Sequence, residues 1–490
     1  MLEKAQQTQY RLPSGLTHRG FLALQIALLL IAPVAAGQNS DGARSWLAGD
    51  HHIHGRYSAD YDETTMPPTP IIGGDSSYPT YVNALMARHF GLSWMVTTDH
   101  GGPNHSKLNL EKAYPELLHS REVISDLIQF YGMELDTPGA EHSSLIIPHS
   151  DHEHHTLYDL ESRFAEEDAF PEDEARDTEA FMLEALRYMG GIPLPPLVLA
   201  NHPSRSARDL GVYGANSPQE LRDWNDAAPQ VAVGMEGAPG HQANAINPDG
   251  SADTSGVRGG YRRYPTMGGF DQMTARLGGF WDSMLGEGRR WWITANSDSH
   301  ANWREGGTDF WPGEYSKTYV FSAKTYDDIL KGIRHGRVFV TTGDLISELY
   351  VTAGAWGDEA TIGGTLSVSE GGEVDVTVRL RDPEGPNYRD ERPQVARVDL
   401  IVGEIVGSPA DRSLDTNPTT RVVQRFTEED WTRDGEYVSM TVTLDDVHHD
   451  GYLRVRGTNT SEEEPSTDPR GEDPWSDLWF YSNPIFIEVR

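Results

Sequence analysis

The sequence predicts an α/β barrel over about residues 44–345, followed by an antiparallel β-sandwich over residues 346–490. In the first region, short and nearly continuous apolar runs alternate with helical stretches, and each run stops at His, Asp, Glu or Asn. Such runs are typical of strands buried on both faces, as in parallel sheets and α/β barrels. After Gly343, apolar and polar residues alternate with a period of two, which indicates half-buried antiparallel strands.

The apolar runs of the first region end where the chemistry of an α/β barrel is found, at the C-terminal ends of its strands. Four runs are followed by polar motifs: 92–96 by Asp99-His100, 127–131 by Glu134, 197–200 by Asn201-His202, and 291–295 by Asp298-Ser299-His300. Residues 81–88 are an example of an intervening helical stretch, as βα units require.

Two insertions interrupt the barrel pattern. Residues 149–190 begin with a His-rich stretch and continue through acidic residues, which predicts a solvated loop or lid, with an accessory metal site as the alternative. Residues 239–269 are rich in Gly, Asn and Pro and are expected to cover the barrel mouth. In the C-terminal region, the alternating stretches are 373–380, 397–402, 437–444, 451–456 and 484–489, and no catalytic constellation accompanies them.

Residues 1–36 have the order of a secretory signal. Basic residues up to Arg19 precede an apolar run over 21–31, and small residues follow up to Ala36. We expect cleavage near Ala36, a periplasmic or extracellular protein, and no membrane span after cleavage. An uncleaved single-span anchor is the alternative.

Composition limits the partners and the chemistry. The 490 residues contain no cysteine, so a disulfide framework, a thiolate metal site and a cysteine nucleophile are all excluded. The formal net charge is -35, and because residues 1–36 carry a net charge of +2, the mature chain would carry -37. Such a surface repels polyanions and argues against binding of nucleic acid polymers, although a small nucleotide could still reach a cationic site.

Two tripeptides, His52-Ile53-His54 and Asp298-Ser299-His300, each place two potential metal ligands two residues apart. In extended backbone, residues i and i+2 project to the same side, so each pair can aim at one point. A single histidine at a strand end is more often structural than a ligand. Recurrence of such residues at five positions favours a metal site, and imidazole with carboxylate suits Zn, Mn or Fe.

In this order, the motifs resemble those of the PHP (polymerase and histidinol phosphatase) metallohydrolases. The matching segments are Asp50-His51-His52-Ile53-His54, Thr98-Asp99-His100, Gly132-Met133-Glu134, Asn201-His202-Pro203 and Asp298-Ser299-His300. The resemblance covers about residues 48–345 and implies a distorted (β/α)7 barrel that binds two or three divalent metal ions. A Gly-Arg-x-x-x-Thr-x-Gly segment at 336–343 and Ser-Asn-Pro-Ile at 482–485 are similar to the secreted branch labelled for carbaryl hydrolase.

The resemblance also implies roles for individual residues. His52, His54, Glu134 and Asp298 would hold one metal ion; Glu134 would bridge to a second, completed by His142 and His202; Asp60, His100 and His300 would complete the set. Where the family has Ser-Asp-Gly, this chain reads Ser58-Ala59-Asp60, which moves the carboxylate one residue along. His142 is assigned by position only, and His149 or His152 could take its place.

The expected chemistry is hydrolysis by a metal-activated water, which needs no Ser or Cys nucleophile. The candidate catalytic residues are Arg205, which would grip a non-bridging phosphate oxygen or else merely pair with acidic loops, and Asp99, which like Asp50 would orient an imidazole. The leading hypothesis is a secreted phosphoesterase acting on a small phosphomonoester. Alternatives are a carbamate or carboxylic ester hydrolase with the same metals, and a non-catalytic protein that binds glycan or a surface polymer. The sequence leaves the oligomeric state open.

Overall fold

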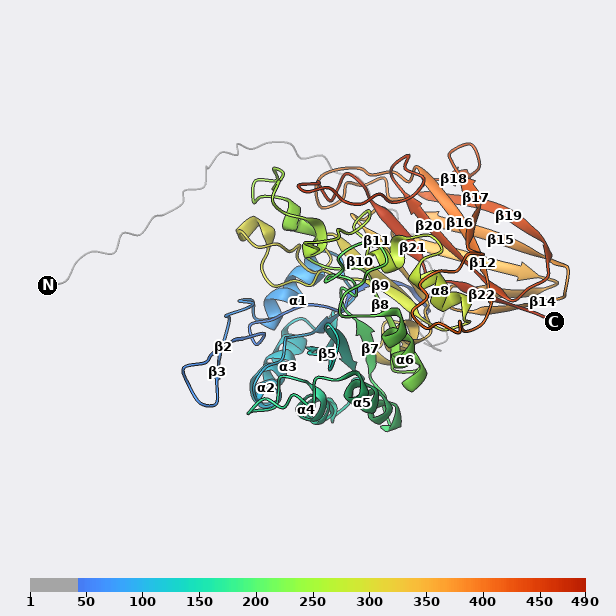
Figure 1. Ribbon diagram of the computed structural model, residues 1–490. Coiled ribbons are helices and arrows are strands. Elements are labelled where there is room, and N and C mark those ends of the chain that lie inside the picture. Colours follow the sequence, from blue (N-terminus) through green and yellow to red (C-terminus); the bar gives the residue numbers. More distant parts are fainter. Residues whose placement is uncertain (1–42) are drawn as a thin grey trace, which may run out of the picture. The chain divides into compact units, whose positions relative to one another are not determined.

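The computed structural model describes residues 43–490, so the predicted signal segment 1–36 lies outside the described residues. The described chain is mixed α/β, with one large mixed sheet, an antiparallel five-stranded sheet and a short hairpin (Figure 1). Strand β1 lies within the large sheet, between a parallel neighbour, β4, and an antiparallel neighbour, β10. The strands of this part are β1 (Ser45–Asp50), β4 (Trp94–Thr97), β5 (Ile128–Leu135), β6 (Ser143–Ile147), β7 (Leu197–Ala200), β8 (Ala232–Ala238), β9 (Trp292–Ala295), β10 (Ser316–Ser322) and β11 (Val338–Thr342).

The direction of the strands differs from the all-parallel arrangement that the apolar runs predict. β1, β4 and β5 are parallel, and so are β7, β8 and β9, but β6 pairs antiparallel with both β5 and β7. Over residues 43–490, no ladder pairs β9 with β1 or β10, so strand pairing does not close a barrel. The segments that follow β1 and β9 instead meet through one parallel bridge, between Ile53 and Ser299.

Helices follow most strands of this part and carry recognisable start signals. The first residue before α6, Ser217, forms a reciprocal capping box with Glu220, and the Thr178 side chain caps α5. The helices are α1 (Thr80–His89), α2 (His105–Leu108), α3 (Tyr114–Val123), α4 (Glu153–Phe164), α5 (Glu179–Gly191), α6 (Pro218–Ala227), α7 (Gln272–Ala275), α8 (Phe280–Gly286) and α9 (Tyr326–Arg334). Shorter turns are η1 (Asn109–Ala113), η2 (Gln242–Ala245), η3 (Arg258–Gly260) and η4 (Trp303–Glu305), and the hairpin is β2 (Asp60–Asp62) with β3 (Thr69–Ile71).

The C-terminal residues form the antiparallel strands that period-two alternation predicts. In β15 (Gly372–Arg381), buried and exposed residues alternate from Val374 to Leu380. The remaining strands are β12 (Glu348–Ala355), β13 (Asp358–Thr361), β14 (Thr365–Val368), β16 (Arg397–Glu404), β17 (Arg421–Phe426), β18 (Thr432–Asp434), β19 (Tyr437–Val447), β20 (Gly451–Thr458), β21 (Trp479–Ser482) and β22 (Ile485–Val489). Val376 of the five-stranded sheet and Val455 of the large sheet belong to one hydrophobic core.

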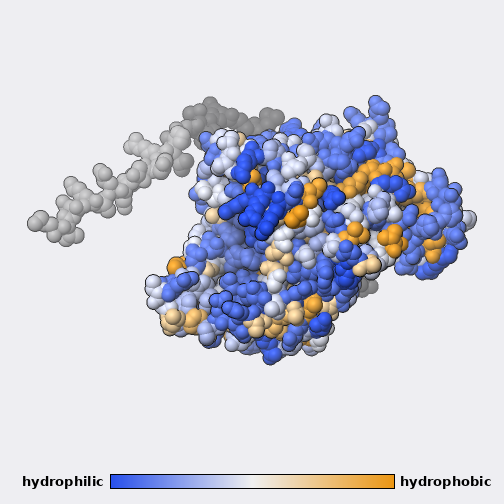
Figure 2. Space-filling view, in the orientation of Figure 1, coloured by the Kyte–Doolittle hydropathy of each residue, from blue (hydrophilic) through white to orange (hydrophobic). Residues whose placement is uncertain are grey.

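The large sheet continues from the first part of the chain into the second. β21 pairs antiparallel with β11, and the sheet then extends through β20 and β22 to β14. The division into domains at residue 345 stays a prediction. The face in Figure 2 is mainly hydrophilic, with apolar patches gathered over the half that holds the C-terminal strands. Within residues 43–490, no helix has both the length and the apolar character needed to cross a membrane.

Candidate metal centre

The segments that contain the two tripeptides run side by side. Ile53 and Ser299 form a parallel bridge, and the amide of His54 donates to the carbonyl of Ser299 at 3.0 Å. Since Ile53 and Ser299 pair, the residues that flank them, His52, His54 and Asp298, project together to the other side. The Asp298 Oδ1 atom lies 3.2 Å from His52 Nε2 and 3.1 Å from His54 Nε2, as the spacing predicts.

Glu134 lies at the centre of the cluster. It is reached through a second parallel bridge, which pairs Glu134 with His100 at the ends of β5 and β4. Its Oε1 atom lies 3.2 Å from nitrogens of three histidines and its Oε2 atom within 3.4 Å of two more, although the carboxylate is almost fully buried. The three near Oε1 are His52, His142 and His202, and the two near Oε2 are His54 and His100. One carboxylate therefore lies among five imidazoles that come from four segments of the sequence.

The ligand atoms fall into adjoining groups, each compact enough to surround a cation. The groups are His52, His54, Glu134 and Asp298; Glu134, His142 and His202; His54, Asp75, His100 and His300; His100, Asp136 and His142; and His241, His300 and Asp309. Eight of the nine predicted ligands belong to them. Asp60 does not, because it lies in the hairpin strand β2 with an exposed side chain, and the acidic residue beside His300 is Asp75. Of the open alternatives, His142 is in the cluster, whereas His149 pairs with Glu153 and His152 precedes α4.

Hydrogen bonds on the outer nitrogens of three rings, those of His52, His54 and His300, determine which nitrogen faces the cluster. The carboxylate of Glu236 can only accept, so His52 Nδ1 donates to it at 2.7 Å. The Ser58 hydroxyl gives its one proton to Asp75 at 2.6 Å and therefore accepts from His54 Nδ1 at 3.1 Å. His300 Nδ1 likewise donates to the carbonyl of Asp298 at 3.0 Å. Partners of this kind orient metal-binding histidines and leave Nε2 available as the ligand.

The nitrogen and oxygen atoms that face one another inside the cluster would be satisfied better by a bound cation than by hydrogen bonds to one another. With their Nδ1 atoms used as donors, His52 Nε2 and His54 Nε2 lie 3.0 Å apart, and both face the Asp298 Oδ1 atom, which is buried without a hydrogen-bond partner. Burial lowers the pKa of His52, but Asp298, Glu134 and Glu236 outweigh it and hold that pKa well above its usual value. Burial and the nearby His300 and His100 hold the pKa of His54 well below its usual value. A proton on His52 would leave His54 unsatisfied, whereas a divalent cation would satisfy both.

Burial keeps His202 and His100 in the neutral form that binds metal, whereas at His142 burial is outweighed by Glu134, which raises the pKa of His142 to about 9. Burial lowers the pKa of His202 to about 3, with Arg205 adding to the effect, and burial lowers the pKa of His100 to about 4. Both imidazoles are therefore neutral near pH 7, as metal ligands must be. Burial raises the pKa of Glu134, but the positive charges of His52 and His142, whose own pKa values are raised, outweigh burial and hold the pKa of Glu134 well below its usual value.

Three residues at the cluster have backbone conformations that side chains other than glycine rarely adopt. The φ angles are 28° at His202, 47° at Asp298 and 53° at His241. Such strain persists where the surroundings determine it and is concentrated at functional sites. Gly240 permits the approach of His241, because a Cβ at residue 240 would lie 2.1 Å from the Cβ of Asp298.

The two candidate catalytic residues occupy different settings. Arg205 lies at the rim of the cluster, and its nearest carboxylate is that of Glu141, at 3.7 Å. Asp99 is buried, and burial raises its pKa to about 6. Its carboxylate accepts from the amide of Gly55 at 2.5 Å, so it holds the segment that follows His54. Asp50 similarly accepts from the amides of His52 and Ser297, at 3.0 and 3.1 Å.

Sequence reasoning missed several members of the site. Glu236 follows the apolar run 231–235 and shows the same pattern of strand and polar residue that identified Glu134, so that signal was present. His241 lies in the second insertion, where its Nε2 atom is 2.9 Å from Asp298 and its Nδ1 atom 2.5 Å from Asp309. Asp136 stands two residues after Glu134, which is the spacing of the two tripeptides, so that signal was also present, whereas Asp75 follows no comparable pattern.

Neither a scan against protein-family models nor a search of the curated proteins finds a match to this chain. The resemblance to the PHP metallohydrolases therefore stays a prediction. The buried cluster of His, Glu and Asp is compatible with a multinuclear metal site, and hence with a metal-dependent enzyme.

Proposed function

We propose that this protein is a multinuclear metal-dependent hydrolase that acts on a phosphomonoester. The observation that carries the proposal is the shared position of Glu134, whose two carboxylate oxygens face different sets of imidazoles within one buried cluster. A carboxylate in this position suits a bridge between cations. We further propose the finer assignments that the resemblance implies, namely a distorted PHP-like barrel, Zn, Mn or Fe as the metals, and secretion.

The residues of the chain would divide the work as follows. The inner ring of ligands, centred on Glu134, would hold the cations, which when bound supply the Lewis acidity that activates water and stabilises an in-line displacement. Glu236 and Ser58 would keep His52 and His54 turned toward the cluster. Burial of these groups excludes bulk water and strengthens each electrostatic contact.

Arg205 supports a phosphate rather than a neutral acyl group as the substrate. Its guanidinium is partly exposed at the rim, and the contact to Glu141 at 3.7 Å is too long for a hydrogen bond. A planar guanidinium free to form two parallel hydrogen bonds is matched to phosphate oxygens. A carbamate or carboxylic ester hydrolase would use the same cations but would have no need of this cation at the rim.

A panel of substrates tests the proposal. The metal-loaded protein would be assayed with 4-nitrophenyl phosphate, bis(4-nitrophenyl) phosphate, 4-nitrophenyl acetate and a nitrophenyl carbamate, with chelator-treated protein as the matched control. We expect the phosphomonoester to have the highest kcat/KM and chelation to abolish its hydrolysis. Faster hydrolysis of the acetate or carbamate would instead support the acyl alternative. If metal-loaded protein hydrolysed none of them, the result would instead support a non-catalytic binding protein.

A further inference from the structure

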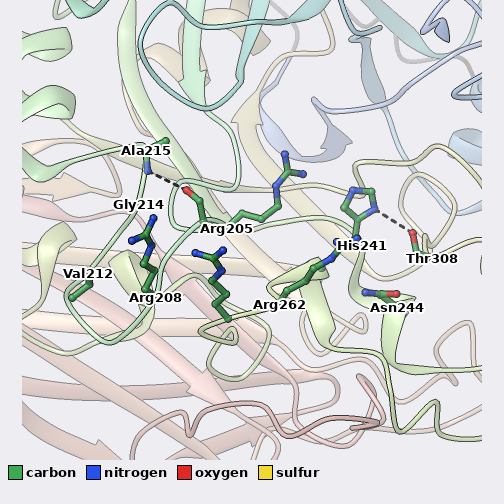
Figure 3. A pocket seen from close by; sticks show the side chains of 12 residues that line it. Arg205, Arg208, Val212, Gly214, Ala215, His241, Asn244, Arg262 and Thr308 are labelled. Carbon is green, nitrogen blue, oxygen red and sulfur yellow. Dashed lines mark hydrogen bonds between the residues drawn. The ribbon is translucent and has the colours of Figure 1, made fainter.

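A second feature beside the metal-binding cluster is an open pocket lined by arginines. It has a volume of about 880 Å³, which is in the range of small-molecule sites. Arg205 and Arg208 come from the loop between β7 and α6, and Arg262 and Arg263 come from the loop between η3 and α7. In the view of Figure 3, Arg205 lies between Arg208 and His241. Two separate loops therefore bring four guanidinium groups to one pocket.

These arginines are not neutralised by the protein. Among residues 43–490, no carboxylate oxygen lies within 4.0 Å of a side-chain nitrogen of Arg208, Arg262 or Arg263, and the side chains of all three are exposed. In the part of the chain that the structure describes, the only carboxylate within that distance of Arg205 is Glu141, at 3.7 Å. In a chain with a net charge of -35, four arginines with so few acidic partners in one pocket make a local positive field.

The arginine pocket adjoins the metal-binding cluster. His241 lines the pocket, and its Nε2 atom lies 2.9 Å from Oδ2 of Asp298, whose other oxygen faces His52 and His54. Arg205 lines the same pocket and donates its amide to the carbonyl of His202 at 2.9 Å. A ligand that occupies the pocket is therefore next to the groups that would hold the cations.

A second pocket that borders the cluster has the opposite charge. Its volume is about 780 Å³, and it includes Asp75, His100, Asp136 and His142 of the cluster. Its other acidic lining residues are Asp60, Glu63, Glu166, Glu167 and Glu172. Like charges at close range repel, so an anionic group of a substrate is disfavoured in this acidic pocket and favoured in the arginine pocket. The two pockets therefore favour one orientation of an anionic substrate at the cluster.

We infer that the arginine pocket is a subsite for a second anionic group, so that the substrate is a phosphomonoester carrying a further phosphate or carboxylate. The inference rests on the proposed function for the group that reacts. The scissile phosphate would lie at the cluster beside Arg205, and the second anion would be held by Arg208, Arg262 and Arg263. The acidic pocket would reject the reversed orientation.

A binding experiment tests the subsite without requiring turnover. The metal-loaded full chain would be titrated by calorimetry with propane-1,3-diylbisphosphonate, with 3-phosphonopropanoate and with propylphosphonate, which offer a second phosphonate, a carboxylate and no second anion. We expect at least one of the first two to bind at least about tenfold more tightly than propylphosphonate, the gain from one or two charge-assisted hydrogen bonds. The comparison of those two identifies the preferred second anion.

The variant Arg262→Gln/Arg263→Gln should reduce that preference to less than about threefold, and Arg208→Gln alone should reduce it in part. Arg187→Gln, on the exposed face of α5, is the matched control and should keep the full preference. Thermal midpoints would establish that the variants are folded. Equal binding of all three ligands to the wild type, or an unchanged preference in the double variant, would overturn the subsite.

The same experiment separates failure of the subsite from failure of the proposed function. A strong preference for the ligands with a second anionic group in a protein that hydrolyses no phosphoester would uphold the subsite and reject the phosphoesterase. Hydrolysis of 4-nitrophenyl phosphate without any preference for a second anion would uphold the phosphoesterase and reject the subsite.

Discussion

Glu236 accepts a hydrogen bond from Nδ1 of His52 at 2.7 Å, and its other oxygen accepts from the amide of His202 at 2.5 Å. The carboxylate therefore fixes the ring of one candidate ligand and the backbone of another, although it belongs to none of the groups of ligand atoms that could surround a cation. Its position at the C-terminal part of β8 places it directly behind the cluster.

Replacing Glu236 with Gln should weaken metal binding without removing a ligand. The amide cannot accept as strongly from His52, so the imidazole loses part of its orientation and basicity, and metal affinity should fall by about 10- to 100-fold. Competition with a chromogenic chelator would measure the change. Glu111→Gln, on the exposed surface of η1, is the control and should leave affinity unaltered. Wild-type affinity in Glu236→Gln would show that this hydrogen bond is unimportant.

Asp75 and Asp60 are the two candidates for the acidic ligand that accompanies His100 and His300. The Asp75 Oδ2 atom lies 3.4 Å from His300 Nε2, whereas Asp60 belongs to no ligand group. We expect Asp75→Asn to lower the bound metal by up to one ion per chain and Asp60→Asn to leave it unchanged, as measured by elemental analysis after dialysis. Loss of metal in Asp60→Asn but not in Asp75→Asn would show that Asp60, the residue implied by the sequence motif, is the ligand.

Arg205→Ala should lower kcat/KM for 4-nitrophenyl phosphate by about 10- to 100-fold, the loss expected when a charge-assisted contact to the substrate is removed. Metal content should not change, because Arg205 is not a ligand, and Arg205→Lys should recover part of the activity. Arg187→Ala serves as the control for loss of an exposed arginine. An unaltered kcat/KM in Arg205→Ala would remove this residue from the mechanism.

The buried pair of His105 and Glu161, whose nearest atoms lie 2.6 Å apart, predicts a dependence of stability on pH. Burial lowers the pKa of His105, but Glu161 outweighs it and raises that pKa to about 9, above the value of about 6.5 in unfolded chains. The stabilisation is complete below about pH 6.5 and is lost as pH rises through about 9, because the native state binds the extra proton in between.

The measurement for this pair is the free energy of unfolding of metal-loaded protein, from urea titrations between pH 6 and 10. The difference between the wild type and His105→Gln should be largest at pH 6 and shrink by about 1.4 kcal/mol per pH unit through that window. Metal loading keeps the imidazoles of the cluster from contributing. A difference that is constant with pH would show that His105 is neutral in the folded protein.

The sequence was sufficient to find the convergence of the cluster. His52 and His54 lie on either side of the bridged residue Ile53, so their common direction follows from local geometry. Asp298 has a φ of 47°, which departs from extended backbone, so the spacing of Asp298 and His300 alone does not give their directions. The period-two alternation of residues 373–380 similarly predicts the half-buried strand β15. These features depend on close neighbours along the chain, which a sequence displays directly.

The rest depends on contacts that local patterns do not encode. The buried residues 143–147 indicate a strand but not its direction, so the sequence does not reveal that β6 runs antiparallel to its neighbours. Asp75 follows a hairpin whose course decides which carboxylate reaches His300, and the motif pointed to Asp60 instead. Arg208 and Arg263 are 55 positions apart in the numbering and meet only because two loops fold over the same pocket.

Metal content is the most direct test of the account, since every proposed role requires imidazoles and carboxylates to share bound cations. Purified protein, dialysed extensively against metal-free buffer, would be analysed by plasma mass spectrometry for Zn, Mn and Fe. The account predicts two or three divalent ions per chain, with fewer in Glu134→Gln. Less than one ion per chain, after purification and after reloading with each metal, would contradict it.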